Sequence, residues 1–407
     1  MEDDESIRTH IREHFENLYQ MPEEMSKEDI LRKLDSYNLL GLSFVHRQEL
    51  DKDFTEKEVK DAVFQLGAWK ASGPDGIPAL VPQKCWNIMG PTITQATLGF
   101  LKSGFILKEL NNTLIKCQSP EKVGDFRPIS LCNVAYKIAS KVLANRLKPI
   151  MEDIITPYQN AFIKGRLISD NLIIAHELLH TIKSKKKDQA RFAAIKVDLS
   201  KAYDRLSWNF LEAVLQKMGF SQLWINSIMQ CVSTVSYRIL INGAPIENIK
   251  PTRGIRQGDP LSTYLFIICA NILSCMLLDI ENKGLIQGID LRKGEMPISH
   301  LFFADDILLF MKLNKQTPEK LKEVLENFCK MSGRKINDSK SVMTISPNCN
   351  SEEREELQHK FKIQMKKKIG KYLGIPIDPC TKMKDIGNQI IDQIQSKLQN
   401  WKGKLLS

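Results

Sequence analysis

Two adjacent acids within an apolar stretch constrain the fold more than any other feature of this sequence. In HLFFADDILLF, Asp305 and Asp306 are flanked on both sides by residues that belong in a protein interior. Burying an unpaired carboxylate is costly, so the pair needs a basic partner, an exposing turn or a cation. Taken alone, such a pair is more typical of a surface turn, and residues 298–310 are predicted to form a β-hairpin.

A third acid follows another predicted strand. The segment AAIKVDLSKAYD leads from apolar and β-branched residues into Asp198, so residues 192–199 are predicted to form a buried strand. Two strands of one sheet can carry Asp198, Asp305 and Asp306 to the same edge. A small set of carboxylate ligands suits Mg²⁺ and phosphate chemistry, whereas zinc and copper sites usually contain His or Cys. Two ions there, with Mn²⁺ as an alternative, would suit in-line nucleotidyl transfer.

The remaining sequence predicts a mixture of helices and strands. Thr55 and Glu58 resemble a capping box before an apolar stripe that begins at Val59. Residues 138–147 are predicted to form a helix with basic residues, including Arg146, beside its buried face, a pattern equally consistent with a solvated surface. The other predicted elements are strands at residues 238–242, 248–253, 341–345 and 372–377, and helices at residues 261–278 and 318–331.

Composition and charge narrow the class of protein. With 407 residues, 43% of them hydrophobic, the chain can bury a large core in two or three lobes. Lys and Arg outnumber Asp and Glu by 58 to 48, a balance that favours polyanionic partners. The nine cysteines show no Cys-x-x-Cys pair, so a reducing compartment is expected. The acidic N-terminus and short apolar runs predict no signal peptide and no membrane span, hence an intracellular protein of the nucleus or cytoplasm.

Seven segments, taken in order, resemble one protein family. They are FRPISLCNVAYKIASKVLANRLKP, QNAFIKGRLISDNL, VDLSKAYD, RGIRQGDPLS, FADD, GRKINDSKS and YLGIPI. Together they resemble the reverse transcriptases of LINE-type, non-LTR retrotransposons, and most of all the plant members. The resemblance covers roughly residues 54–378 and implies an α+β right-hand polymerase. Its parts are fingers, an antiparallel palm sheet like that of an RNA-recognition motif packed on helices, and a helical thumb.

The resemblance also implies a division of the chain. Residues 1–50 are expected to be an N-terminal extension or linker, because they show helical spacing and many charges but no motif. Residues 51–378 are expected to form the fingers and palm, and residues 379–407 the start of a thumb. Since the sequence ends about 30 residues after YLGIPI, this thumb is expected to be truncated.

The resemblance assigns roles to individual residues. Asp198, Asp305 and Asp306 fall on the catalytic metal ligands. Tyr203 falls on the aromatic that crowds the sugar 2′-carbon and selects deoxynucleotides, although alone it is more typical of core packing, while Lys340 falls on the lysine that protonates pyrophosphate. The other implied roles are triphosphate contacts by Lys116 and Arg127, support of the nascent base pair by Gln257 and Gly258, and a primer grip at Tyr372, Leu373 and Gly374. Asp204 is expected to be a local capping or salt-bridge residue.

The implied activity is that of an RNA-directed DNA polymerase that uses an RNA template, a DNA primer, deoxynucleoside triphosphates and Mg²⁺. One alternative is a truncated, weak or inactive remnant that still binds nucleic acid through basic surfaces. The other is an RNA-dependent RNA polymerase on the same palm. The intact acids argue against the first alternative and Tyr203 against the second. The departures from the family pattern, such as Thr263 in place of Pro, remove no metal ligand, and the oligomeric state stays open.

Overall fold

The computed structural model describes residues 4–21, 23–116, 128–184, 190–241, 243–291, 294, 296–377, 391 and 395. The chain divides into two compact units, each with its own sheet. The first unit comprises residues 1–165, 199–279 and 324–335, and the second comprises residues 166–198, 280–323 and 336–407.

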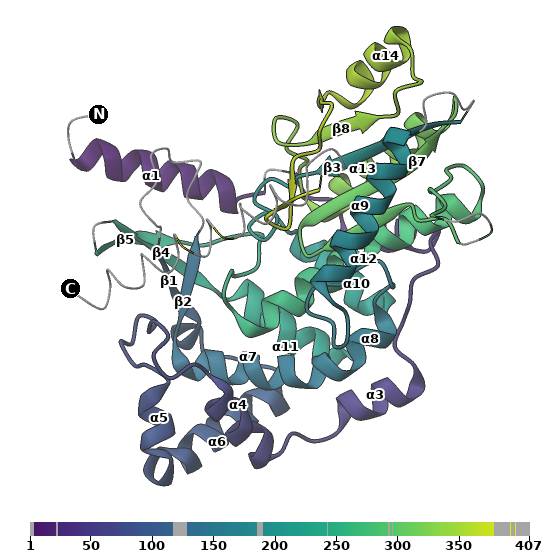
Figure 1. The fold of residues 1–407 in the computed structure, drawn as a ribbon. Coiled ribbons are helices and arrows are strands. Elements are labelled where there is room, and N and C mark those ends of the chain that lie inside the picture. The colour runs from purple at the N-terminus through teal and green to yellow at the C-terminus, as the bar shows by residue number, and fades with distance from the viewer. Residues whose placement is uncertain are drawn as a thin grey trace. The chain divides into compact units, whose positions relative to one another are not determined.

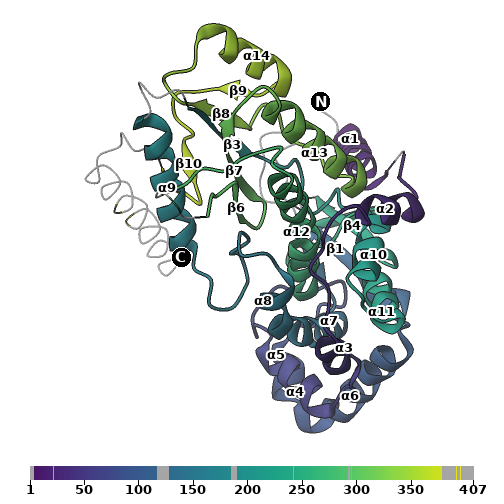
Figure 2. The same cartoon turned by 90° about the vertical axis from the view of Figure 1, so that its right-hand side faces the viewer.

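The second unit is built on a sheet that has five strands among the described residues (Figure 2). Its strand order is β6-β7-β3-β8-β9, and every neighbouring pair is antiparallel except β8 and β9. These strands confirm the predicted hairpin over residues 298–310 and the predicted strands near residues 192–199 and 341–345. Their bounds are β3 (Arg191–Val197), β6 (His300–Phe303), β7 (Asp306–Leu313), β8 (Val342–Ile345) and β9 (Gln364–Met365).

Helix α9 (Ile168–Ser184) covers one face of this sheet, beside β3 and β6 (Figure 1). Its buried residues repeat at helical spacing and pack against Phe192, Leu308 and Phe310 of the strands. Each fully buried Leu, Ile or Phe contributes about 1.5–3 kcal/mol. The core of the second unit therefore lies between α9 and the strands that end at the acids. The buried residues of α9 are Asn171, Ala175, Leu178, Leu179 and Ile182.

The described part of the second unit also contains a small hairpin and a further helix. Strands β10 (Lys371–Tyr372) and β11 (Ile375–Pro376) are joined by Leu373 and Gly374, whose φ angles are 51° and 82°. Positive φ at both central residues is typical of a two-residue type I′ turn. Helix α14 (Ser351–Phe361) begins at a capping box made by Asn350 and Glu353.

The sheet of the first unit has the order β2-β1-β4-β5. β1 (Asn112–Lys116) pairs antiparallel with β2 (Ile129–Cys132) and parallel with β4 (Ser236–Ile241). β4 and β5 (Ala244–Ile249) are antiparallel. The strand predicted over residues 238–242 is therefore confirmed, whereas the strand predicted over residues 248–253 lies several residues earlier, at Ala244–Ile249. Helix α1 (Asp4–Tyr19) packs on this sheet, since the Tyr19 and Tyr237 rings lie 4.8 Å apart in a shared buried cluster. Part of the segment expected as an extension thus contributes to the core of the first unit.

Helices form the rest of the first unit. The predicted capping box is present, because Thr55 Oγ1 accepts from the Glu58 N–H while the Glu58 carboxylate accepts from the Thr55 N–H. Arg146 is not part of a solvated basic face, since its guanidinium pairs with Glu58 and lies 3.6 Å from the Phe54 ring centroid. The helices are α2 (Lys27–Leu34), α3 (Phe44–Asp51), α4 (Glu56–Gln65), α5 (Leu80–Lys84), α6 (Trp86–Ser103), α7 (Val134–Leu147), α8 (Met151–Ile154), α10 (Trp208–Lys217) and α11 (Gln222–Ser233), with 3₁₀ turns η1 (Lys108–Asn111) and η3 (Lys148–Ile150).

Two longer helices contribute residues to both units and match the helices predicted over residues 261–278 and 318–331. They are α12 (Pro260–Asn282) and α13 (Thr317–Ser332). Among the described residues, α12 is the helix long and apolar enough to cross a membrane by length and composition alone, but 83% of its apolar window is buried inside the protein. This burial is what a core helix shows.

Candidate active site

Asp198 and Asp306 lie at the same end of the β3–β7 pair. Asp198 directly follows Val197, the last residue of β3, and Asp306 directly precedes Ile307, to which Val197 is paired. Both acids are half-buried, whereas Asp305 is exposed in the turn before β7. The fold of the second unit therefore brings three carboxylates to one end of one sheet. Among the described residues, no three His, Cys, Asp or Glu side chains are gathered closely enough to hold a metal ion by themselves.

The turn that presents Asp305 has a strained backbone. β6 and β7 pair up to Phe303 and Asp306, which leaves a two-residue turn of Ala304 and Asp305. Ala304 has a φ angle of 55°, a left-handed conformation that costs a non-glycine residue about 1–2 kcal/mol. Backbone strain of this kind is concentrated at functional sites, where the surrounding structure maintains it.

Both backbone polar groups of Asp198 are held by the segment before β8. The Asn337 N–H donates to the Asp198 carbonyl oxygen at 2.8 Å, and the Asp198 N–H donates to Ser341 Oγ at 3.1 Å. Ser341 is fully buried, so this acceptor is fixed by the core. The segment before β8 thus fixes the backbone of Asp198 at the end of β3.

Lys340 lies in this same segment and is exposed. Its backbone N–H donates to the carbonyl oxygen of Asn337, the residue that also contacts Asp198. The sequence separates Lys340 from Asp198 by more than a hundred residues, and the structure joins their backbones through one intervening residue. The Lys340 residue is accessible to solvent.

The hairpin at residues 371–376 is tied to the acid-bearing strands by a buried amide. Asn171 Nδ2 donates to the Phe302 carbonyl oxygen and to Tyr372 Oη, each at 3.0 Å. Burial raises the pKa of the Tyr372 phenol, and the nearby Asp306 carboxylate adds to that rise. Tyr372 is fully buried, whereas Leu373 is half-buried and Gly374 exposed. Of the three residues predicted to form a primer grip, Leu373 and Gly374 are therefore available to a ligand, whereas Tyr372 is not.

In the first unit, Tyr203 is fixed by the segment RGIRQG. The Ile255 N–H donates to the Tyr203 carbonyl oxygen at 2.9 Å, and the Gly254 N–H donates to the Leu206 carbonyl oxygen at 2.7 Å. The Tyr203 ring stacks on Phe266 of α12, with centroids 4.4 Å apart and 5° between the planes. Tyr203 itself is half-buried.

Three more of the predicted residues belong to the first unit. The Gln257 carbonyl oxygen accepts from the Ser130 N–H of β2, and Gly258 is exposed with a φ angle of 98°, a conformation suited to glycine. Lys116 is exposed at the end of β1, where it pairs with Ile129, the residue before Ser130. Gln257 and Lys116 are therefore connected through adjacent residues of β2. Arg127 lies outside the described residues.

Arg256 and Asp259, which flank Gln257 and Gly258 in the sequence, were not predicted to be functional from the sequence. The buried Arg256 guanidinium donates to the Cys231 carbonyl oxygen at 2.7 Å and lies 3.7 Å from the Tyr136 ring centroid. The buried Asp259 carboxylate accepts from both the N–H and the hydroxyl of Ser262 in the first turn of α12. The sequence feature that could have indicated them is the pair of opposite charges on either side of Gln257 and Gly258 in RQGDP. Their role is to anchor the loop at both ends.

Asp204 is a buried residue of the first unit. Burial raises the pKa of its carboxyl group to about 7, an effect that Lys201 and a hydrogen bond from Tyr19 partly offset. The carboxyl group faces α1 and two arginines, Arg205 and Arg253, rather than solvent. Asp204 is thus part of the packing of the first unit.

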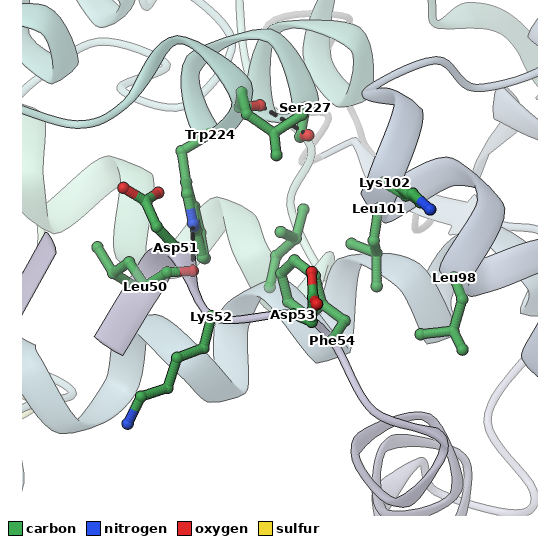
Figure 3. A pocket seen from close by; sticks show the side chains of 12 residues that line it. Leu50, Asp51, Lys52, Asp53, Phe54, Leu98, Leu101, Lys102, Trp224 and Ser227 are labelled. Atoms are coloured by element: carbon green, nitrogen blue, oxygen red, sulfur yellow. Dashed lines mark hydrogen bonds between the residues drawn. The ribbon is translucent and has the colours of Figure 1, made fainter. Parts of the chain in front are cut away.

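A cavity of about 290 Å³ also lies within the first unit (Figure 3). Leu98, Leu101 and Trp224 form part of its apolar wall, and the Trp224 indole N–H donates to the Leu50 carbonyl oxygen at 2.9 Å. Asp51, Lys52 and Lys102 are among its charged lining residues. It contains none of the residues assigned above to chemistry.

Comparison with known proteins identifies a family over most of the chain. Residues 116–377 match the protein family described as "Reverse transcriptase (RNA-dependent DNA polymerase)". The match contains all three carboxylates, Lys340 and the hairpin at residues 371–376.

Individual relatives include proteins of mobile elements. The chain is 26% identical over its whole length to a transposon TX1 uncharacterized protein of Xenopus laevis, and 30% identical over 54% of its length to a retrovirus-related Pol polyprotein of element R2 of Popillia japonica. It spans only 31% and 30% of the lengths of these two relatives. An uncharacterized mitochondrial protein of Arabidopsis thaliana is 48% identical, but over only 16% of the chain. The expected special likeness to plant members is therefore not supported.

Proposed function

The chain belongs to the reverse transcriptase family, and from this premise we propose that it is the RNA-directed DNA polymerase of a non-LTR retrotransposon. In this reaction a primer 3′-hydroxyl attacks the α-phosphate of a deoxynucleoside triphosphate, and pyrophosphate leaves. The observation that carries the proposal is the placement of Asp198 and Asp306 at the same end of the β3–β7 pair, with Asp305 in the turn that precedes β7.

The donor set fits Mg²⁺. Its three members are carboxylates, and Mg²⁺ takes oxygen ligands, keeping several positions for water and substrate phosphates. Asp198, Asp305 and Asp306 would therefore hold two ions, with Mn²⁺ as a substitute, and leave the remaining positions to the substrate. The bound ions would stabilise the charge on the attacking and leaving oxygens. The backbone of Asp198 is held at the end of the sheet by two hydrogen bonds, one donated by the Asn337 N–H and one accepted by Ser341 Oγ.

The other residues are assigned to the substrate. The exposed Lys340 would donate a proton to the leaving pyrophosphate, since its backbone is joined to that of Asp198 through Asn337. Lys116 and Arg127 would contact the triphosphate, Gln257 and Gly258 would support the nascent base pair, and Tyr203 would exclude a sugar 2′-hydroxyl. Because Tyr372 is buried, the primer grip would use Leu373 and Gly374 at the tip of the hairpin.

The partners follow from the same assignment. An RNA template and a DNA primer are polyanions, and the net charge of +10 favours their binding. In the right-hand description, the sheet of the second unit is the palm, and the sheet and α4 to α7 of the first unit belong to the fingers. The proposed start of a thumb at residues 379–407 falls, apart from residues 391 and 395, outside the described residues.

Primer extension on an RNA template tests this function. Purified protein is given deoxynucleotides or ribonucleotides with Mg²⁺, and template binding is measured in parallel. We expect extension with deoxynucleotides that Asp305→Asn abolishes while binding is retained. Binding without extension by the unsubstituted chain would instead identify a nucleic-acid-binding remnant, and preferential use of ribonucleotides would identify an RNA polymerase.

A further inference from the structure

Tyr203 is held at its backbone and at its ring by different parts of the first unit. At the backbone, its carbonyl oxygen accepts from the Ile255 N–H at 2.9 Å. The neighbouring Gly254 has a φ angle of 94°, and a side chain there would begin 2.6 Å from the Asp204 carbonyl oxygen. The segment around Gly254 is thus packed directly against the backbone of Asp204, the residue after Tyr203.

With the backbone fixed, the direction of the Tyr203 ring depends on what its side chain touches. Phe266 is fully buried on α12, and its ring lies parallel to that of Tyr203 at a centroid distance of 4.4 Å. A flat aromatic partner restricts rotation of the stacked ring more than an aliphatic side chain does, because only the parallel arrangement keeps the whole contact. The stack on Phe266 therefore supports one face of the Tyr203 ring.

Phe266 is itself held in place. The Arg334 guanidinium carbon lies 4.4 Å from the Phe266 ring centroid, and Arg334 is buried in the same unit. A cation over an aromatic ring is attracted by the ring quadrupole, and the contact adds to the packing of α12 around Phe266. The arrangement runs from a buried cation through a buried ring to the ring of the half-buried Tyr203.

We propose that Phe266 is a positioning residue for sugar selection, which acts by fixing the orientation of the Tyr203 ring. The inference rests on the proposed role of Tyr203 in excluding the 2′-hydroxyl. Steric exclusion is a difference between the binding of two sugars, and it requires that the excluding group cannot move aside. A Tyr203 ring without its stacking partner can rotate away from the added oxygen, so ribonucleotides gain while deoxynucleotides are little affected.

The test measures kcat/KM for single deoxynucleotide and ribonucleotide additions and takes their ratio. Tyr203→Ala is compared with Phe266→Leu, which keeps an apolar side chain but removes the flat face. Phe210→Leu is the matched control, because Phe210 is also a fully buried ring of the first unit but has its aromatic contact with Phe328. If Phe266→Leu does not fold, Phe266→Met takes its place, since it fills a similar volume without a ring.

We expect Phe266→Leu to lower the deoxynucleotide-to-ribonucleotide ratio about three- to tenfold, as suits the loss of one stacking contact. Phe210→Leu should leave the ratio unchanged. If Tyr203→Ala lowers the ratio and Phe266→Leu does not, the inference is wrong while the role of Tyr203 stands. If Tyr203→Ala leaves the ratio unchanged, the role of Tyr203 fails first. An equal fall in Phe210→Leu would show general loosening of the core and would overturn the positioning role.

Discussion

The side-chain amide of Asn171 donates a hydrogen bond of 3.0 Å to the phenol oxygen of Tyr372, and a second of the same length to the Phe302 carbonyl oxygen. Asn171 is fully buried on α9, Tyr372 belongs to the small hairpin, and Phe302 belongs to the strand that leads into the acids. One amide therefore connects three elements of the second unit. A buried amide is favourable only while its partners are in place.

Replacement of Asn171 should destabilise the second unit more than replacement of its partner. Asn171→Leu removes both hydrogen bonds and leaves the Phe302 carbonyl without this donor, so we expect a loss of about 2–4 kcal/mol in the free energy of unfolding. Tyr372→Phe removes a single hydrogen bond and should cost about 1 kcal/mol. Urea unfolding of both variants checks this order. Equal losses would show that the bond to Phe302 contributes nothing.

Ser341→Ala should slow catalysis while it leaves substrate binding nearly intact. The substitution removes the acceptor of the Asp198 N–H. The backbone that carries the Asp198 carboxylate then keeps only one of these two hydrogen bonds, the one from Asn337. Small displacements of a reacting group are expensive, and we expect kcat to fall about tenfold with little change in KM for deoxynucleotides. Steady-state primer extension measures both constants.

Two further variants serve as controls for Ser341. Ser341→Thr keeps a hydroxyl and should restore most of the rate. Ser351→Ala alters an exposed serine of the same unit and should have no effect. A normal kcat in Ser341→Ala would mean that Asn337 alone holds Asp198.

The strained turn at Ala304 makes a prediction about stability. Glycine adopts positive φ without steric cost, so Ala304→Gly should raise the free energy of unfolding by up to about 1 kcal/mol, whereas the β-branched Ala304→Val should lower it. Thermal or urea unfolding of the two variants measures the difference. A less stable Ala304→Gly would indicate that the methyl group packs favourably enough to outweigh the strain.

Asp204 should make stability fall with rising pH. Its pKa is raised to about 7 in the folded protein by burial, so between about pH 4 and pH 7 the folded state binds a proton that the unfolded state has lost. The free energy of unfolding therefore decreases through this window, by at most about 4 kcal/mol. The charged groups around the carboxyl group, which limit the decrease, are Lys201, Arg205 and Arg253.

Asp204→Asn removes this titration. Urea unfolding at pH 5 and at pH 8 should show that the unsubstituted protein loses more stability between the two values than Asp204→Asn does. The same pH dependence in both proteins would place the titration elsewhere. The neutral Asn keeps a similar shape, so it separates the effect of charge from the effect of packing.

The sequence was informative where local pattern determines structure. The apolar residues before Asp198 and around Asp305 predicted β3 and the β6–β7 hairpin, and the capping box predicted the start of α4. Contacts between distant segments were not predictable in this way. The bonds of Asp198 to Asn337 and Ser341, and the buried environment of Arg256, depend on tertiary packing that leaves no periodic signal.

The sequence left the placement of a residue open where its type is compatible with two environments. A basic residue beside a buried helix face can be solvated or can pair internally, and Arg146 does the second by binding Glu58 and stacking on Phe54. Residues 6–20 and 26–37 had helical spacing without a motif, so their burial against the first unit could not be foreseen. Charge and spacing alone do not distinguish a linker from an element that packs on a sheet.

The most direct test of the central claim is the rate of one nucleotide addition to a primer on an RNA template, measured as Mg²⁺ is varied, for the unsubstituted chain and for Asp198→Asn. If Asp198 is a metal ligand for nucleotidyl transfer, the rate will depend on Mg²⁺, and Asp198→Asn will lose at least about 10³-fold while primer and template still bind. Extension by Asp198→Asn at the unsubstituted rate and at the same Mg²⁺ concentrations would contradict the assignment of this site.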